Sequence, residues 1–506
     1  MNYLIGVDVG TTSTKAILYD EHAHVIGKFS QGYPLYRDIN GMAEEDPQQI
    51  GTAVEKVIHD AAAQLNFDND QLTSVSFSSA NQSLILLDKH LQPLTRAMTW
   101  ADTRARHQAD QLKKTPLGKQ LYERTGTPIH PMSPLTKLLW LKDEHPDQLA
   151  TADFIGDIKS YLFARFFGVF KVDISIASCT GMMNIKTSNW DDKALKETGI
   201  ARQQLPTIVS GTTQERGLNS KAATAMGIPA DTPFVYGAFD GALSNLGVGA
   251  IKQDTVAITI GTSAGVRVIS NQPLIDPQQR LFCYALDRGL WVIGGQLNNG
   301  GDVFQWAVEH LVDASAVKNE KTDAYTLAND VIANVPAGAH GLIFNPFLGG
   351  ERAPLWNASA RGSFFGLTNL HTRADMLRAV LEGINMNIAT VFEAVCDLVG
   401  QPTSVTATGG FSQSPVWRQM LADILNCPVN IPQAFESGCL GATMVAMKSL
   451  GMVENYAAVQ NFIGDQQSYQ PQSSAVDTYQ RYLPLFKSLE KVLTPAYGQI
   501  AQLQQN

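Results

Sequence analysis

The chain begins with the two-residue alternation of apolar and other side chains that is typical of a β-strand. The apolar face of this strand is formed by Tyr3, Ile5, Val7 and Val9. Asp8 lies on the opposite face. Turn-forming residues at 10–13 and 20–22 separate the strand from two further strand-like segments, residues 15–19 and 25–29. The pattern therefore predicts that the chain opens as an antiparallel meander.

A second segment, residues 256–263, repeats the pattern of residues 5–12. The matched pairs are Gly10 with Gly261, Thr11 with Thr262, and Asp8 with Thr259. Short strands that end in Gly-Thr also match by chance, but each copy stands at the start of roughly half of the chain. We therefore interpret the repeat as a duplication of two related domains.

Segments with helical spacing of apolar residues lie between the strand-like segments. Residues 50–64 and 374–399 carry apolar side chains three and four positions apart, which predicts helices. Strands and helices in each half indicate α/β domains. A glycine-rich stretch at 241–254 marks their boundary, so we expect an N-terminal domain of residues 1–245 and a C-terminal domain of residues 246–506.

An amphipathic helix is predicted near the C-terminus, at residues 479–493. Its apolar face predicts that it packs on the body of the protein. Pro484 lies inside this pattern and is expected to interrupt the helix, because proline cannot donate the backbone hydrogen bond of a helix interior.

Composition places the chain among globular proteins and narrows its partners. Apolar residues make up 44% and charged residues 17% of the 506 residues, a length that exceeds one hydrophobic core. The formal net charge of −9 disfavours nucleic acid and anionic membranes as partners, although a small anion can still bind in a cleft. The five scattered cysteines argue against a disulfide framework and a zinc site. With no apolar stretch near 18 residues and no signal-peptide pattern, we expect a cytoplasmic protein.

The glycine-rich turns after the two repeated strands are candidate phosphate-binding sites. Exposed backbone N–H groups and hydroxyls can donate to phosphate oxygens. The residues that offer them are Gly10, Thr11 and Thr12 in the first copy and Gly261 and Thr262 in the second. Neither turn is a Walker A loop, because no G-x-x-x-x-G-K-[ST] run is present. Each turn alone is also typical of an ordinary hairpin, whereas a facing pair would clamp the phosphates of one nucleotide.

Two carboxylates lie beside these turns. Asp8 would repel phosphates unless Mg²⁺ intervened, and Mg²⁺ takes few protein ligands and keeps several waters. Capping of the turn by Asp8 is the alternative. Asp240 follows a strand at the position where a helix would begin, which is typical of an N-cap. We expect the helix N-terminus to lower the pKa of Asp240, although phosphoryl transfer asks little of a base.

Two glycines in succession, Gly409 and Gly410, stand where a strand ends and a helix begins. Paired glycines expose backbone that a flat ring such as adenine can approach closely. They are also typical of a simple strand-to-helix turn, so both interpretations stay open.

Taken together, these segments resemble the FGGY carbohydrate kinase family over nearly the whole chain. Residues 132–144 are similar to the first family signature, and residues 362–367, continued through Asp375 to Glu382, are similar to the second. The resemblance implies an α/β fold of two duplicated actin/hexokinase-like (ribonuclease H-like) ATPase domains with a cleft between them. It also implies ATP and Mg²⁺ as cofactors.

The resemblance assigns roles to individual positions. Asp240 corresponds to the residue that accepts the proton of the sugar hydroxyl, and Asp8 is the candidate metal ligand. The positions that correspond to substrate contacts are Asn81, Gln82, Trp100, Asp102, Met132 and Asp240. Those that correspond to nucleotide contacts are Gly10, Thr11, Thr12, Gly261, Thr262, Gly301, Gln305, Gly410, Phe411 and Ser414.

Three segments are similar to the gluconate kinase branch of the family, namely residues 99–104, 130–135 and 240–247. The implied reaction is phosphorylation of D-gluconate by ATP to 6-phosphogluconate. The carboxylate of this substrate would need a cation or dense hydroxyl donors, for which Arg104 and His130 are candidates, with a purely structural role as the alternative for each. Kinases of xylulose, ribulose or glycerol are the alternative, although Asn81-Gln82 differs from the pairs typical of glycerol and xylulose kinases.

A more distant alternative is a non-catalytic ATPase module of the same fold, such as a chaperone or filament protein. Asp240 and the predicted sugar pocket speak against it. The sequence does not specify the oligomeric state, and a homodimer is compatible with it.

Overall fold

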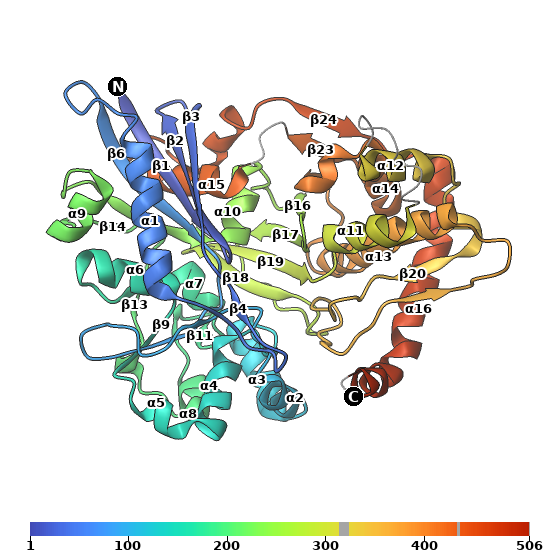
Figure 1. Ribbon diagram of the computed structural model, residues 1–506, viewed down its shortest axis with the longest axis horizontal. Helices are drawn as coiled ribbons and strands as arrows, with labels where there is room; N and C mark the ends of the chain where they lie inside the picture. The colour runs from blue at the N-terminus through green and yellow to red at the C-terminus, as the bar shows by residue number, and fades with distance from the viewer. Residues whose placement is uncertain (313–322, 433–435, 505–506) are drawn as a thin grey trace.

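Two mixed β-sheets, one in each half of the chain, form the frame of the protein (Figure 1). The computed structural model describes residues 1–312, 323–432 and 436–504. The first sheet has the order β14 (Gln214–Glu215), β15 (Phe234–Phe239), β6 (Gln71–Ser79), β1 (Asn2–Val9), β2 (Ser13–Asp20), β3 (Val25–Gly32). The second has the order β18 (Phe282–Asp287), β19 (Leu290–Leu297), β17 (Ala264–Ser270), β16 (Thr255–Ile260), β22 (Ser404–Thr408), β23 (Val429–Pro432), β24 (Gln466–Tyr469).

The two sheets share one topology, which extends the repeat seen in the sequence. β1 pairs antiparallel with β2 and parallel with β6, and β16 pairs antiparallel with β17 and parallel with β22. The predicted opening meander of β1, β2 and β3 is confirmed. The register places Asp8 opposite Lys15 in the first copy and Thr259 opposite Gly265 in the second. The two copies therefore align at these three central strands, although the first sheet has six strands and the second has seven, and they differ in the charged residues that they present.

Helices cover both sheets. α1 (Pro47–Ala62) packs on β1, β2 and β3, and α13 (Arg373–Val399) packs on β17 and β19, so both predicted helices are confirmed. α13 is long and apolar enough to span a membrane, but 94% of its most apolar window is buried inside the protein. It is therefore the core helix of the second half, which explains its apolar composition.

The remaining elements connect these layers. Between β6 and β15 lie α2 (Arg106–Lys113), α3 (Pro116–Thr125), α4 (Pro134–Glu144), α5 (Pro146–Ala150), α6 (Ile158–Phe167), α7 (Ile174–Ser178), α8 (Asp192–Thr198) and α9 (Ser220–Met226). The second half adds α11 (Gly301–Leu311), α12 (Ala324–Ala333), α14 (Pro415–Leu425) and the hairpin of β20 (Ile343–Asn345) with β21 (Ser363–Phe365). Short two- and three-residue strands such as β4 (Tyr36–Arg37), β5 (Ala43–Glu45) and β8 (Ala97–Met98) brace the loops of the first half.

The C-terminal helix corrects one expectation from the sequence. α16 (Ser473–Leu503) continues through Pro484 and Pro495, so the predicted interruption at Pro484 was wrong. Leu483 and Phe486, on either side of Pro484, are both buried. Burial of this apolar face outweighs the loss of one backbone hydrogen bond, because tertiary packing supplies most of the stability of helices in proteins.

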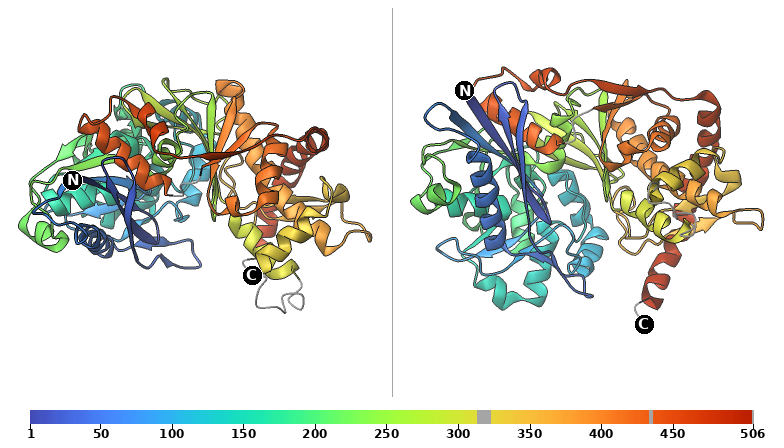
Figure 2. Two further views of the ribbon diagram at one scale, coloured as in Figure 1. Left: turned by 90° about the horizontal axis from the view of Figure 1, so that it is seen from above. Right: turned by 45° about the horizontal axis from the view of Figure 1, so that its top comes forward.

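Two helices cross between the sheets. α15 (Ser437–Ser449) comes late in the chain yet packs on β1 and β6 of the first sheet, and Figure 2 shows it in orange-red beside the blue strands. α10 (Asp240–Gly247) packs on α15 and on β17 of the second sheet. The crossing is close: a Cβ atom on Gly441 would lie 2.1 Å from the Leu243 carbonyl oxygen, and one on Gly6 would lie 2.4 Å from the Cys439 carbonyl oxygen. Backbone therefore meets backbone where the two halves join.

Substitution of Gly441 by alanine should destabilise the protein by about 2 kcal/mol or more, because the added methyl group meets a carbonyl oxygen that cannot move without its helix. The control is Gly498→Ala, because Gly498 lies in α16 with open space around its Cβ position. Alanine is the better helix former there by about 1 kcal/mol. Thermal unfolding of the two variants measures the difference. Equal melting temperatures would show that α10 and α15 are not closely packed.

Candidate active site

A cavity of about 440 Å³ opens beside the second of the two turns that the sequence predicts to bind phosphate. It is lined by all seven nucleotide positions predicted in the second half of the chain, Gly261, Thr262, Gly301, Gln305, Gly410, Phe411 and Ser414. Five aromatic or amide side chains that sequence reasoning missed also line it, namely Phe304, Tyr325, Asn329, Gln413 and Trp417. The structure therefore brings together residues that are up to 156 positions apart (417 minus 261) in one cavity.

The two predicted turns have similar local geometry. The N–H group of Gly10 donates to the Ser13 carbonyl at 3.0 Å, and that of Gly261 donates to the Ser263 carbonyl at 2.9 Å. In the second copy the N–H group of Gly301 also donates to the Gly261 carbonyl at 2.7 Å, at the first residue of α11. This contact aims the N-terminus of α11 at the turn. A helix N-terminus carries partial positive charge, so the arrangement favours an anion such as phosphate.

Aromatic rings form one wall of the same cavity. The ring centroid of Trp417 lies 5.2 Å from that of Phe304 and 5.9 Å from that of Phe411. Gly409 stands at a φ of +113°, and a Cβ atom there would lie 2.1 Å from the Ile260 carbonyl oxygen. Glycine is therefore required at this strand-to-helix turn for close packing on β16. The rings pack edge to face and together form an apolar wall of the kind that a nucleotide base can contact.

A much smaller hollow of about 10 Å³ adjoins the first turn. Its lining includes Gly10, Thr11, Asn81 and Trp100, and also the buried Glu45. The indole N–H group of Trp100 donates to Thr11 Oγ1 at 2.9 Å, and Asn81 Nδ2 lies 3.2 Å from Cys179 Sγ. One predicted substrate position, Trp100, therefore contacts the first predicted turn, and a second, Asn81, lines the same hollow.

The other predicted substrate positions lie around this hollow without lining it. Gln82 is buried and donates through Nε2 to the Tyr284 hydroxyl at 3.0 Å, across the two halves of the chain. Asp102 has no exposed surface and forms an ion pair of 2.6 Å with Arg104. Met132 is buried in the core, whereas the predicted phosphate contact Thr12 is exposed at its turn.

Neither Arg104 nor His130 is free to pair with a substrate carboxylate as a cation. Arg104 is held by Asp102 and also by Glu44, whose Oε1 lies 2.5 Å from Nη2. Burial, together with nearby Arg352 and Lys113, lowers the pKa of His130 to about 3, so its ring is neutral. A carboxylate would therefore find no unpaired cation at either of these two positions.

A buried lysine organises the segments that carry the predicted substrate residues. Lys137, in α4, has no exposed surface and donates through Nζ to the carbonyl oxygens of Gln82 at 2.7 Å and Thr99 at 2.6 Å. Burial lowers the pKa of Lys137 to about 7. The lysine therefore fixes the loop backbones on both sides of the hollow and acts as a positioning residue.

Asp240 is the first residue of α10, and its Oδ1 accepts a hydrogen bond from the Gly241 N–H group at 2.6 Å. The strand that leads to it is held by Lys159, which donates to the carbonyl oxygens of Tyr236 and Ala238 and pairs with Asp173 at 2.9 Å. Backbone contacts therefore fix the position of Asp240 from both sides.

The Gly241 N–H group at the helix N-terminus does lower the pKa of Asp240, as expected, but the expectation of a pKa below the ordinary value was wrong. The pKa of this carboxyl is raised to about 6, first by burial and then by the charge of Asp8. Arg267, the Gly241 N–H group and Arg352 oppose this effect without cancelling it. Burial removes the carboxylate from water, and this raises its pKa by more than the helix N-terminus lowers it.

Asp8 is the last residue but one of β1, its charge acts on Asp240, and Ser78 Oγ donates to its Oδ1 at 2.6 Å. Burial raises the pKa of Asp8. Among the described residues, no group of three or more His, Cys, Asp or Glu side chains could enclose a metal ion. The donor set fits Mg²⁺ but not a closed protein site, because Mg²⁺ takes one or two carboxylates and completes its shell with water and phosphate oxygens.

Comparisons with known proteins agree with this geometry. The chain matches the models of the FGGY family of carbohydrate kinases, with the N-terminal domain at residues 3–247 and the C-terminal domain at residues 256–450. It is 42% identical to a gluconokinase of Bacillus licheniformis over 508 residues, which cover 100% of this chain and 99% of that protein. A gluconate kinase structure from Lactobacillus acidophilus has a TM-score of 0.94 and 38% identity and covers 99% of both chains. A ligand-bound xylulose kinase from the same organism gives the same two values over 99% of this chain and 100% of that chain.

Substitution of Asp240 by asparagine should stabilise the folded protein at pH 8 by about 1–3 kcal/mol. The folded pKa of about 6 exceeds the ordinary value of 3.8, so stability is lost as the pH rises from about 3.8 to about 6, and the full cost of the ionised carboxylate is present above that range. Below pH 4 the acid is protonated in both the folded and the unfolded chain, and the gain should vanish. Calorimetric melting of both proteins at pH 8 and pH 4 measures this. A gain that does not depend on pH would contradict the raised pKa.

Proposed function

This chain belongs to the FGGY family of carbohydrate kinases, and we propose that it transfers the terminal phosphoryl group of ATP to D-gluconate, giving 6-phospho-D-gluconate and ADP. The observation that carries the proposal is the place of Asp240, whose charge interacts with Asp8 beside the first turn and with Arg267 beside the second. The full-length similarity to gluconokinases supports the acceptor. Xylulose is the second candidate, because a xylulose kinase structure is equally similar.

The proposed reaction places ATP in the 440 Å³ cavity, with the base against the rings of Phe411 and Trp417. The hydroxyl groups of Thr11, Thr12 and Thr262 would donate to phosphate oxygens, and the partial positive charge at the N-terminus of α11 would attract them. Asp8 would hold Mg²⁺ through water, and the ion would neutralise phosphate charge. Asp240 accepts the proton of the acceptor hydroxyl as its oxygen bonds to phosphorus and the bond to the ADP oxygen breaks. A carboxyl with a pKa near 6 is ionised at neutral pH and still accepts a proton readily.

The acceptor is tested by phosphorylation rates over a panel of D-gluconate, D-xylulose, D-ribulose and glycerol with ATP and Mg²⁺. The value of kcat/KM should be highest for D-gluconate, by about a hundredfold or more, since a polar site rejects analogues that leave its groups unpaired. Turnover of D-xylulose at an equal or higher rate would assign the enzyme to the second candidate. ATP hydrolysis that no acceptor stimulates would point to a non-catalytic module.

Substitution of Asp240 by asparagine should lower kcat by about a thousandfold, within the range that a general base contributes, with little change in ATP affinity. In the parent enzyme, kcat/KM should rise with pH around a midpoint near 6, because only the ionised carboxylate accepts a proton. Steady-state rates from pH 5 to 8 and calorimetric titration with ATP measure both effects. Near-normal turnover in the variant would remove Asp240 from this role.

A further inference from the structure

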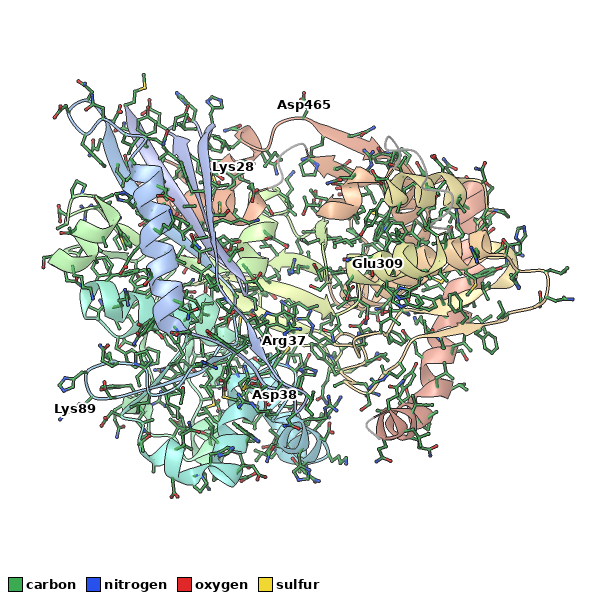
Figure 3. The ribbon with its side chains drawn as sticks, in the orientation of Figure 1. Lys28, Arg37, Asp38, Lys89, Glu309 and Asp465 are labelled. Atoms are coloured by element: carbon green, nitrogen blue, oxygen red, sulfur yellow. The ribbon has the colours of Figure 1, made fainter. Side chains whose placement is uncertain are left out.

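Two arginines in the cleft are buried without an acidic partner. Charged side chains are normally exposed, as Figure 3 shows for Lys89 and Asp465. Arg267 is only 8% exposed and Arg352 only 5% exposed. The Nε atom of each is buried and has no hydrogen-bond partner in the part of the chain that the structure describes. Arg378, which is 9% exposed, shows how a buried arginine is normally neutralised. Its Nε atom forms an ion pair with Glu382 Oε1 at 2.7 Å.

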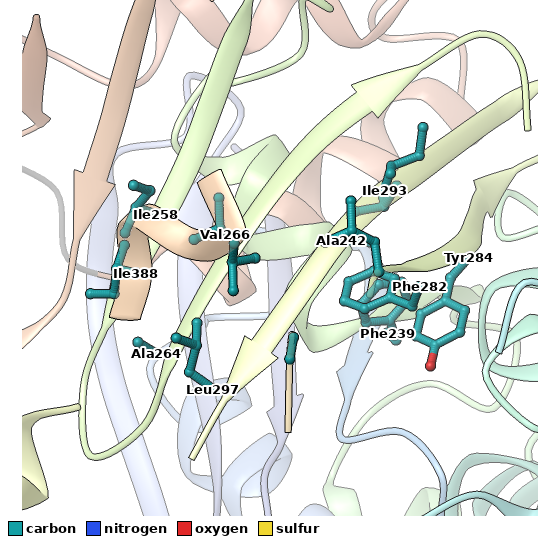
Figure 4. Close-up of a cluster of buried hydrophobic side chains, with 14 of the residues drawn as sticks. Phe239, Ala242, Ile258, Ala264, Val266, Phe282, Tyr284, Ile293, Leu297 and Ile388 are labelled. Atoms are coloured by element: carbon teal, nitrogen blue, oxygen red, sulfur yellow. The ribbon is translucent and has the colours of Figure 1, made fainter. Parts of the chain in front are cut away.

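The fold makes room for Arg267 at the start of α10. Side chains alternate along β17, so Ala264 and Val266 face the core near Ile388 of α13, as Figure 4 shows, and Arg267 faces the other way. A Cβ atom on Gly265 would lie 2.6 Å from Arg267 Nη2, and one on Gly241 would lie 2.8 Å from Arg267 Nε. The guanidinium therefore fits between two glycines, and Gly241 is the residue that follows Asp240.

Arg352 reaches the same region from the loop after β20. Its Nη1 atom donates to Gln296 Oε1 and its Nη2 atom to the Leu297 carbonyl oxygen, both at 3.0 Å. The guanidinium carbon lies 4.8 Å from the ring centroid of Trp100, which lines the predicted sugar hollow. Arg352 therefore joins the second sheet to the substrate side of the cleft.

The carboxylates near this pair do not neutralise it. Glu351 precedes Arg352, but its Oε2 atom accepts hydrogen bonds from Asn299 at 2.9 Å and Asn387 at 2.6 Å. Asp240 attracts both guanidinium groups, yet it lies outside the 4.0 Å of an ion pair from either. Burial lowers the pKa of Arg352 to about 10, so the group remains a cation at neutral pH. A buried, unpaired cation costs several kcal/mol, and an anion that enters the site relieves that cost.

We propose that Arg267 and Arg352 bind the carboxylate of the substrate and thereby select an aldonate over a neutral sugar. The inference rests on the proposed function and adds the residues that choose the acceptor. A guanidinium group is planar and presents two parallel donors, which match the two oxygens of a carboxylate. The proximity of Arg352 to Trp100 and of Arg267 to Asp240 puts this anion site next to both the sugar hollow and the reacting hydroxyl.

The test compares D-gluconate with D-gluconamide, which differs only in its uncharged amide. Arg267→Gln and Arg352→Gln should each lower the ratio of kcat/KM for gluconate to kcat/KM for gluconamide by about a hundredfold, mainly through KM for gluconate. Arg267→Lys should recover part of the ratio, because it keeps the charge but loses the planar donors. Arg216→Gln, at an exposed ion pair with Asp231, is the matched control and should leave the ratio unchanged.

The other anion within reach is the phosphoryl group in transfer. If the arginines bind that group, the variants will lose activity equally on gluconate and gluconamide, the ratio will not change, and the proposal is overturned. Calorimetric binding of gluconate without ATP gives a readout that does not depend on turnover. Weaker binding in Arg267→Gln supports the anion site even if the parent enzyme prefers another acceptor, and unchanged binding overturns it. Arg267→Met, which fills the same space without charge, shows that the loss comes from charge and not from misfolding.

Discussion

Where α10 crosses α15, glycines let the backbone of each helix contact the backbone of the other. The rest of the cleft depends on this close packing. Gly247 and Gly441 remove the side chains that would hold the two helices apart, and Gly6 does the same between α15 and β1. Asp240 begins α10, and Asp8 lies two residues after Gly6. The separation of the two acids is therefore set by main-chain packing, which is stiffer than side-chain packing. α15 comes from the second half of the chain, so neither acid is placed by its own half alone.

Burial has opposite effects on the acids and the cations of the same cleft. It raises the pKa of Asp240 and of Asp8, and it lowers the pKa of Arg267 and of Arg352. The positive charges of Arg267 and Arg352 lower the pKa of Asp240 and so offset part of the effect of burial. Asp240 is therefore ionised at neutral pH, with a pKa of about 6 that lies only a little below it. A carboxyl group with this pKa is mostly ionised at neutral pH and is still basic enough to accept a proton, and proton transfer at neutral pH requires both properties.

Much of the frame could be predicted from the sequence, because local patterns encode it. The alternation at residues 3–10, its echo at 256–263 and the helical spacing at 374–399 each predicted an element that the structure contains. The pKa of Asp240 could not be predicted, since its main causes are burial and Asp8, which is 232 positions away (240 minus 8). The sequence indicates that Arg267 is unusual, because it is a charged residue inside the apolar strand 264–270. Its position beside Gly241 could not be predicted, because that position depends on tertiary packing. Asn329 left none, because only the fold brings it to Ser414.

The two similar halves of the chain differ in the side chains that they present at equivalent positions. Where the first copy has Asp8, the second has Thr259, and where α10 begins with Asp240 and Gly241, α15 begins with Ser437 and Gly438. Two identical copies would form a pseudo-dimer with two equivalent half-sites, each with its own acids. In this chain the second copy carries a hydroxyl side chain at both of these positions, where the first copy carries a carboxylate. The two halves therefore remain similar in their backbone but differ in these side chains. As a result, these two carboxylates of the cleft come from the first copy alone.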